Sequence, residues 1–262
     1  MKRTITILSI LIISIAVFSH EIHCKHFLYG MPQGSPDTND IIIRDCYALS
    51  SDDNTKFADW VCYRLTKAEI TGSVSQTRTW KADPWLDETE TLEPNDYKDA
   101  NSDIGTDRGH QAPLASFKGT NCWSDTNYLS NITPQKSDLN QGAWKKLEDA
   151  VRHCISSSSD HNFTLWVITG PIYGDTTMKL PKADEFHKVP KAYWKIVATK
   201  SGTGIQVNAF IMPQDTPRAA HFQDYQTTVD EIEHDTGLDF FWALDDTLET
   251  PTEATKATLF LQ

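Results

Sequence analysis

Five apolar runs of strand length constrain the fold of this chain more than any other feature. Their alternating or continuously apolar character is typical of β-strands. We expect strands at Ile41–Leu49, Trp60–Leu65, Thr164–Ile172, Ala192–Thr199 and Ile205–Met212. The polar, turn-prone stretch Ser50–Lys56 would join the first two as a hairpin. Long loops and few helices separate these runs, so the pattern predicts an α+β domain with antiparallel strands rather than a doubly wound fold.

Two segments carry helix signals. They are Leu139–Ser156 and Thr228–Thr236, the second followed by Gly237 as the expected C-cap. The stretch Pro84–Thr106 lies between the second expected strand and the first expected helix. It is acidic and rich in Pro and Asp, which predicts an irregular surface excursion.

The first helix has two distinct stripes. Its apolar stripe, expected to pack on the sheet, consists of Trp144, Leu147, Val151 and Cys154. Asn140, Glu148 and Arg152 lie on an adjoining stripe, at steps of eight and four. An amide, a carboxylate and a guanidinium in one row form a candidate site. The alternative is that Glu148 and Arg152 form an ordinary i,i+4 surface salt bridge.

The N-terminus resembles a secretory signal peptide. Lys2 and Arg3 precede the apolar stretch Ile5–Phe18, and Ser19 suits the last position before a cleavage site. A retained membrane anchor is the alternative, but the stretch is shorter than the roughly 20 residues that span a bilayer. We therefore expect residues 1–19 to be removed and residues 20–262 to form one domain, exported to the periplasm or outside the cell.

The charge and the cysteines limit the function classes. The formal charge of −12 becomes −14 without Lys2 and Arg3, which argues against tight, processive nucleic-acid binding but not against a local basic cleft. None of the five cysteines forms a C-x-x-C pair, which argues against structural zinc. In an oxidising compartment Cys46 and Cys62, on adjacent expected strands, would form a cross-strand disulfide, unless they are simply core residues.

The segment Asp107–Pro113 is the most informative for chemistry. His110 can act as a neutral base because histidine titrates near pH 6.5. Arg108 suits a phosphate, which a guanidinium can bind with two hydrogen bonds. Gly109 would leave room for a substrate backbone.

The context of this segment resembles a known family, the secreted sugar-non-specific DNA/RNA endonucleases of the ββα-metal (His-Me finger) superfamily. The resemblance covers about Ile41 to Leu244. Its motifs are Asp107–His110, Asn127–Gln135, Asp138–Trp144, Thr77–Pro84, Thr169–Tyr173, Ala192–Lys195 and Thr228–Glu233.

The resemblance implies a fold and a reaction. The fold would be a central antiparallel sheet flanked by helices, with a ββα-metal motif that has His110 on its strand side and Asn140 at the start of its helix. The reaction would be hydrolysis of DNA and RNA to products with 5′-phosphates. The cofactor would be Mg²⁺, for which Mn²⁺ is an alternative.

The resemblance also implies residue roles. Asn140 would anchor a largely hydrated ion, and Glu148 would accept hydrogen bonds from the waters of that ion. His110 would take the proton from the attacking water. Arg78, Arg108 and Arg152 would contact phosphates, while Asp107, Asn131 and Gln135 would bind substrate or order the site. Asn140 as a helix cap and Arg78 as a sheet-surface arginine are the alternatives.

Two other functions remain open on the sequence alone. One is a phosphodiesterase of this fold with a non-polymeric substrate. The other is a non-catalytic nucleic-acid-binding module, which would be expected to have lost His110 or Asn140, yet this chain keeps both. We expect DNA and RNA as partners and no membrane contact after signal cleavage. The oligomeric state, including a homodimer, stays open.

Overall fold

The computed structural model describes residues 21–74, 77–175, 178–202 and 204–261. The expected signal peptide, residues 1–19, lies outside the described residues. Within them, no helix combines the length and the apolar character needed to cross a membrane.

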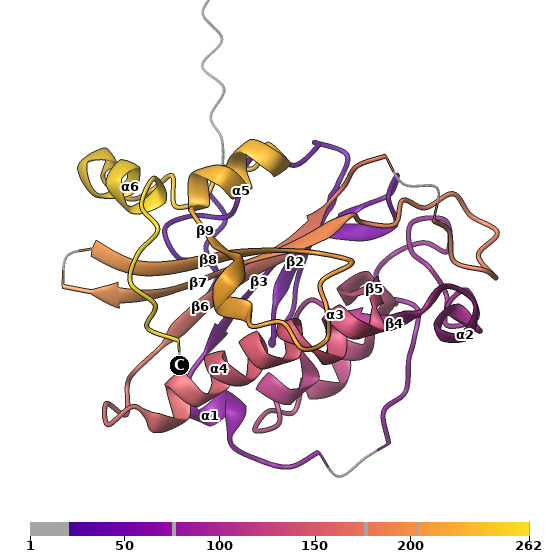
Figure 1. Ribbon diagram of the computed structural model, residues 1–262, viewed down its shortest axis with the longest axis horizontal. Coiled ribbons are helices and arrows are strands. Elements are labelled where there is room, and N and C mark those ends of the chain that lie inside the picture. Colours follow the sequence, from indigo (N-terminus) through magenta and orange to yellow (C-terminus); the bar gives the residue numbers. More distant parts are fainter. Residues whose placement is uncertain (1–20, 75–76, 176–177, 203, 262) are drawn as a thin grey trace, which may run out of the picture.

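A seven-stranded antiparallel sheet forms the centre of the molecule, in the order β1-β2-β3-β6-β7-β8-β9 (Figure 1). The strands are β1 (Asp40–Ile43), β2 (Ala48–Asp52), β3 (Phe57–Leu65), β6 (Leu165–Ile172), β7 (Ala192–Ser201), β8 (Gly204–Pro213) and β9 (Gln226–Thr227). The expected α+β class with an antiparallel sheet is therefore confirmed, and β3, β6, β7 and β8 match four of the expected strands.

The first expected strand, Ile41–Leu49, is wrong as a single element. It is divided into β1 and β2 by a tight turn in which the backbone N–H of Arg44 donates to the carbonyl of Tyr47 at 2.8 Å. The charged pair Arg44–Asp45 interrupts the apolar run at this point. As a consequence β2 extends into the expected connection Ser50–Lys56, and the turn to β3 begins only after Asp52.

Helices cover both faces of the sheet (Figure 1). On one face lies α4 (Ala143–Ser157), beside the short α1 (Lys67–Ile70). Trp144, Leu147 and Val151 of α4 pack in the core as expected. On the other face lies α5 (Val229–Thr236), which Thr228 caps at its N-terminus and Gly237 at its C-terminus. It packs on the sheet through Val229 and Ile232, and α6 (Asp246–Glu253) lies next to it.

A separate two-stranded ribbon carries the candidate chemistry. It pairs β4 (Thr106–His110) with β5 (Ile132–Lys136) and continues directly into α3 (Ser137–Gln141). The preceding stretch Pro84–Thr106 consists mostly of turns, as expected, but it ends in α2 (Ala100–Ile104). It is not purely a surface excursion, because Leu92, Tyr97 and Ala100 are buried in a core cluster. The remaining helices are 3-10 turns: η1 (Leu114–Ser116), η2 (Trp123–Asn127), η3 (Leu129–Asn131) and η4 (Phe222–Tyr225).

Gly142 divides the helix that was expected to run unbroken from Leu139 to Ser156. Its backbone is non-helical (φ −104°, ψ −116°) and separates α3 from α4. A Cβ at this position would lie 2.3 Å from the carbonyl oxygen of Asp138 and 2.7 Å from that of Arg218, so only glycine fits. The expected single stripe of Asn140, Glu148 and Arg152 is therefore wrong, because Asn140 belongs to α3 and the other two belong to α4.

The expected disulfide between Cys46 and Cys62 is also wrong. Cys46 lies in the β1–β2 turn and is bonded to Cys122, with the two Cα atoms 5.8 Å apart. Cys62 is opposite Ala48 in the sheet and packs in the core on the α5 side, where it is a buried free thiol. The two side chains thus pack in the cores on opposite faces of the sheet. Cys24 and Cys154 are free as well.

Candidate active site

The ribbon and α3 form a ββα unit of the kind that the sequence resemblance implies. In the β4–β5 register, Asp107 lies opposite Gln135 and His110 lies opposite Ile132. Because α3 begins directly after β5, the chain folds back and brings Asn140 into contact with Asp107.

Asp107 organises this unit as a hydrogen-bond acceptor. It accepts from Nδ2 of Asn140 at 2.9 Å, Nε2 of Gln141 at 2.7 Å, Oγ of Ser137 at 2.8 Å and Nδ2 of Asn101 at 2.8 Å. Burial raises the pKa of Asp107, but these four donors outweigh it and hold the pKa below its ordinary value. The bond to Asp107 uses the amide nitrogen of Asn140, and no hydrogen bond among the described residues engages its carboxamide oxygen.

His110 is held in one orientation by its neighbours. Its Nε2 lies 3.2 Å from Oδ1 of Asn127, and Nδ2 of Asn127 donates to the carbonyl of Ser124 at 3.3 Å. Since the amide nitrogen of Asn127 is committed, its oxygen accepts, and Nε2 carries the ring proton. Nδ1 then keeps the lone pair of a base. Burial lowers the pKa of His110 to about 4, opposed by the bond to Asn127 and helped by the nearby Arg78 charge.

A cavity of about 420 Å³ opens beside this unit, and its lining includes Arg78, Trp80, Arg108 and Asn140. The guanidinium carbons of Arg78 and Arg108 lie 5.3 and 5.5 Å from the Trp80 ring centre. The ring of His110 is not part of the lining, but it packs on Trp80 with ring centres 5.2 Å apart. Trp80 therefore lies between the His110 ring and the two arginines.

The two arginines are held differently. Arg78 is exposed, whereas Arg108 is half-buried and donates from Nη2 to the carbonyl of Pro94 at 2.9 Å. Burial lowers the pKa of Arg108, and its Nε has no hydrogen-bond partner within the described residues. A second cavity of about 530 Å³ shares Asn101 and Gln141 with the first, so the hollow surface continues past α3.

The structure places Glu148 and Arg152 in a separate cluster on α4. Their closest charged atoms are 4.0 Å apart, and the two side chains are only 14% and 17% exposed, so the pair is not an ordinary surface salt bridge. Arg152 also bonds Asp149 at 2.5 Å and Ser116 at 3.3 Å. Neither Glu148 nor Arg152 lines the cavity beside Asn140.

Lys195 of β7 completes that cluster and is fully buried. Its Nζ lies 4.6 Å from the centre of the Trp144 ring and 3.5 Å from the Tyr63 hydroxyl. Burial lowers the pKa of Lys195 to about 8, although the negative charge of Glu148 opposes this. Burial likewise raises the pKa of Glu148, and the positive charges of Lys195 and Arg152 oppose that change.

Asn131 and Gln135 are buried and shape the ribbon from within. Oδ1 of Asn131 accepts from the backbone of Ala112, and its Nδ2 donates to the carbonyls of Ala112 and Thr126. This fastens the turn after His110 to η2. A Cβ at Gly109 would lie 2.6 Å from the Gln135 side chain. Gly109 therefore makes room for Gln135, rather than for substrate as the sequence had suggested.

Three residues of these clusters escaped the sequence reasoning as site candidates: Trp80, Asn127 and Lys195. Each lies inside a motif segment of the family resemblance, but the resemblance assigns no role to these side chains. Their importance comes from contacts with residues far away in the sequence, to which no local pattern points.

Comparisons with known proteins agree with this geometry. Residues 26–247 match the family described as DNA/RNA non-specific endonuclease. A protein named nuclease from Serratia marcescens is 46% identical over 215 residues, 82% of this chain and 79% of that protein. A nuclease from Nostoc sp. is 29% identical over 249 residues, 87% of this chain and 85% of that protein.

A solved structure shares the fold. A chain in the crystal structure of the EndoG/EndoGI complex superimposes with a TM-score of 0.70 at 23% identity, covering 84% of this chain and 91% of that one. The family match extends over most of the chain and includes the whole ββα unit. This protein belongs to the DNA/RNA non-specific endonuclease family.

Proposed function

We propose that this endonuclease is an exported, Mg²⁺-dependent enzyme that cleaves DNA and RNA without marked sequence preference and leaves 5′-phosphates. One observation carries the proposal. A single ββα unit holds both an oriented neutral imidazole, His110, and an oriented carboxamide, Asn140, beside a cavity with two arginines.

His110 acts as the general base. Its Nε2–H bond to Asn127 leaves Nδ1 to take the proton from the attacking water. Burial keeps the imidazole neutral at physiological pH, and a well-placed base contributes about 10²- to 10⁴-fold to the rate.

Asn140 is the metal ligand, and the donor set fits Mg²⁺. The ion prefers oxygen ligands and keeps several waters, so one carboxamide oxygen beside an open cavity is sufficient. Asp107 fixes the side chain from behind, as partners of metal ligands commonly do. When bound, the ion supplies electrostatic stabilisation of the charge that develops on the phosphate and the leaving oxygen. Mn²⁺, which takes similar ligands, would substitute.

The other residues support these two. Arg78 and Arg108 bind phosphates in the cavity that they line. We assign to Glu148 the role of accepting hydrogen bonds from waters of the ion, and to Arg152 a phosphate contact; both assignments rest on the family resemblance. Asn131 and Gln135 order the ribbon through their buried contacts.

A nicking assay on the mature protein tests the proposal. We expect plasmid DNA and a structured RNA to be degraded in Mg²⁺ or Mn²⁺, with products that a 5′-phosphate-dependent exonuclease digests. Excess EDTA should abolish cleavage, and renewed Mg²⁺ should restore it. Undiminished cutting in EDTA would overturn the metal assignment.

The export part of the proposal has its own test. Residues 20–262 form the mature domain, so the secreted protein should begin at His20. N-terminal sequencing of protein recovered outside the cytoplasm measures this directly, and a mature chain that begins at Met1 would contradict it.

A further inference from the structure

Three carboxylates converge between α5 and α6, on the face of the sheet opposite the ββα unit. Oxygen atoms of Asp230, Glu233 and Glu253 all lie within 4.8 Å of one another. Glu253 is only 8% exposed, and its Oε1 atom is sealed from solvent without a hydrogen-bond partner. A buried carboxylate oxygen with no partner is costly and calls for a compensating group.

The stretch of chain that forms this group is strongly acidic; the nearest basic residues in the sequence are His234 within α5 and Lys256 after α6. Residues 219–255 contain ten acidic residues and neither Lys nor Arg. No ion pair of the described residues involves an acid of this stretch. Glu253 is also the last residue of α6, where the negative end of the helix dipole disfavours an anion. Burial, with Glu233, Glu249, Asp230 and Asp239, raises the pKa of Glu253 to about 8.

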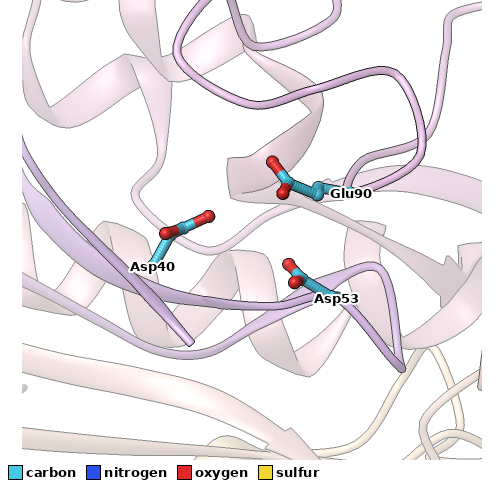
Figure 2. Close-up of side chains that lie close together, drawn as sticks. All are labelled: Asp40, Asp53 and Glu90. Atoms are coloured by element: carbon cyan, nitrogen blue, oxygen red, sulfur yellow. The ribbon is translucent and has the colours of Figure 1, made fainter. Parts of the chain in front are cut away.

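Another acidic group of the protein shows what compensation looks like. It consists of Asp40 in β1, Asp53 just after β2 and Glu90 on a nearby loop. Their carboxyl groups point toward one another (Figure 2). There Asp40 is exposed, and Lys56 bonds the backbone carbonyls of Asp53 and Thr89 beside the group. Oδ1 of Asp53 also lacks a hydrogen-bond partner within the described residues, but Asp53 is only partly buried. Solvent at Asp40 and the charge of Lys56 therefore partly balance this cluster, whereas Glu253 has neither.

We propose that Asp230, Glu233 and Glu253 bind one Ca²⁺ ion that joins α5 to α6 and is separate from the ion at Asn140. Carboxylate oxygens are the preferred ligands of Ca²⁺. Its bonds of about 2.3–2.6 Å let it bridge oxygens up to about 5 Å apart, and it tolerates irregular geometry completed by waters. The backbone N–H of Phe240 donates to Oε1 of Glu233 at 2.9 Å and holds one ligand in place.

Calorimetric titration of the mature protein with Ca²⁺, paired with thermal denaturation, tests this. Glu253→Gln should bind one Ca²⁺ fewer than the wild type, whereas Asn140→Ala should keep that site. Ca²⁺ at about 100 times its dissociation constant should raise the Tm of wild type and Asn140→Ala by about 5–10 °C, and should not raise that of Glu253→Gln.

Two further variants make the outcome decisive. Asp230→Asn changes an exposed ligand, so it should fold normally and still weaken Ca²⁺ binding at least tenfold. Asp40→Asn, at the compensated cluster, should leave binding and Tm unchanged. Cleavage of DNA in Mg²⁺ should be normal in Glu253→Gln, which separates this site from catalysis. Equal Ca²⁺ stoichiometry in wild type and both α5–α6 variants would overturn the proposal.

Discussion

Asp107, which is half-buried, and Glu253, which is buried, lie on opposite sides of one sheet and have opposite surroundings. Asp107 accepts hydrogen bonds from four side chains, three in α3 and one in the neighbouring α2, and its pKa lies below the ordinary value. Glu253 has other carboxylates as neighbours, and its pKa is raised to about 8. A carboxylate whose hydrogen bonds the chain supplies can orient a neighbouring side chain, as Asp107 orients Asn140. One that the chain leaves unsatisfied favours a proton or an external cation.

The largest expected effect lies on the Asp107 side. His110→Ala should slow single-turnover cleavage by at least about 10²- to 10⁴-fold, because it removes the group that we propose takes the proton. Its Mg²⁺ requirement should persist in the residual activity, and added imidazole should partly restore the rate.

Asn140→Ala is the matched variant for that measurement. It should lose activity, need more Mg²⁺ and show no rescue by imidazole. A near-normal rate in His110→Ala would show that the base has been assigned to the wrong residue.

The same chemical change at the two carboxylates gives a smaller but sharper contrast. Asp107→Asn removes the charge that collects four donors, so Asn140 loses its fixed orientation. We expect activity to fall about 10- to 100-fold, as for other partners of metal ligands, with a raised Mg²⁺ requirement. Glu253→Gln should retain wild-type activity and Mg²⁺ dependence.

A cleavage titration over Mg²⁺ concentration measures both variants together. An unchanged Mg²⁺ requirement in Asp107→Asn would contradict the idea that Asp107 orients Asn140 while Glu253 has no part in catalysis.

The smallest expected effect is on stability, and its sign differs between the sides. The pKa of His110 is lowered from 6.5 to about 4, so the unfolded state binds more protons and stability falls as pH drops from 6.5 toward 4. The pKa of Glu253 is raised from 4.5 to about 8, so stability falls as pH rises between these values. Each slope is at most about 1.4 kcal/mol per pH unit.

Urea denaturation in EDTA across pH 4–8 measures these slopes. Relative to wild type, His110→Ala should gain stability toward acid and Glu253→Gln toward alkali. Parallel curves for wild type and Glu253→Gln would mean that this carboxyl is not shielded.

The sequence predicted the large sheet well, because long apolar runs such as those of β7 and β8 leave few alternatives. It missed β4 and β5, whose residues Thr106–His110 and Ile132–Lys136 include glycine and proline and lack a strand pattern. The site itself depends on that ribbon, so His110 and Asn140 were found through family resemblance and not through periodicity.

Tertiary contacts decided the rest. The helix break at Gly142 follows from the close approach of the Arg218 backbone, which no local signal reveals. The partner of Cys46 lies 76 residues away, beyond the reach of strand-by-strand reasoning. Likewise, the four donors of Asp107 come from α2 and α3 and meet only in the folded chain.

The disulfide between Cys46 and Cys122 makes the support of the His110 segment depend on the redox state of the surroundings. Cys122 immediately precedes η2, the turn that ends in Asn127, whose side chain contacts the imidazole of His110. The thiols must give up two electrons to form the bond, which reducing cytosol does not favour. A chain in which Cys46 and Cys122 are still reduced would therefore hold η2, and with it His110, less firmly than the oxidised chain. Under the proposed export, nucleic acids of the producing cell would therefore meet the protein before this disulfide has formed.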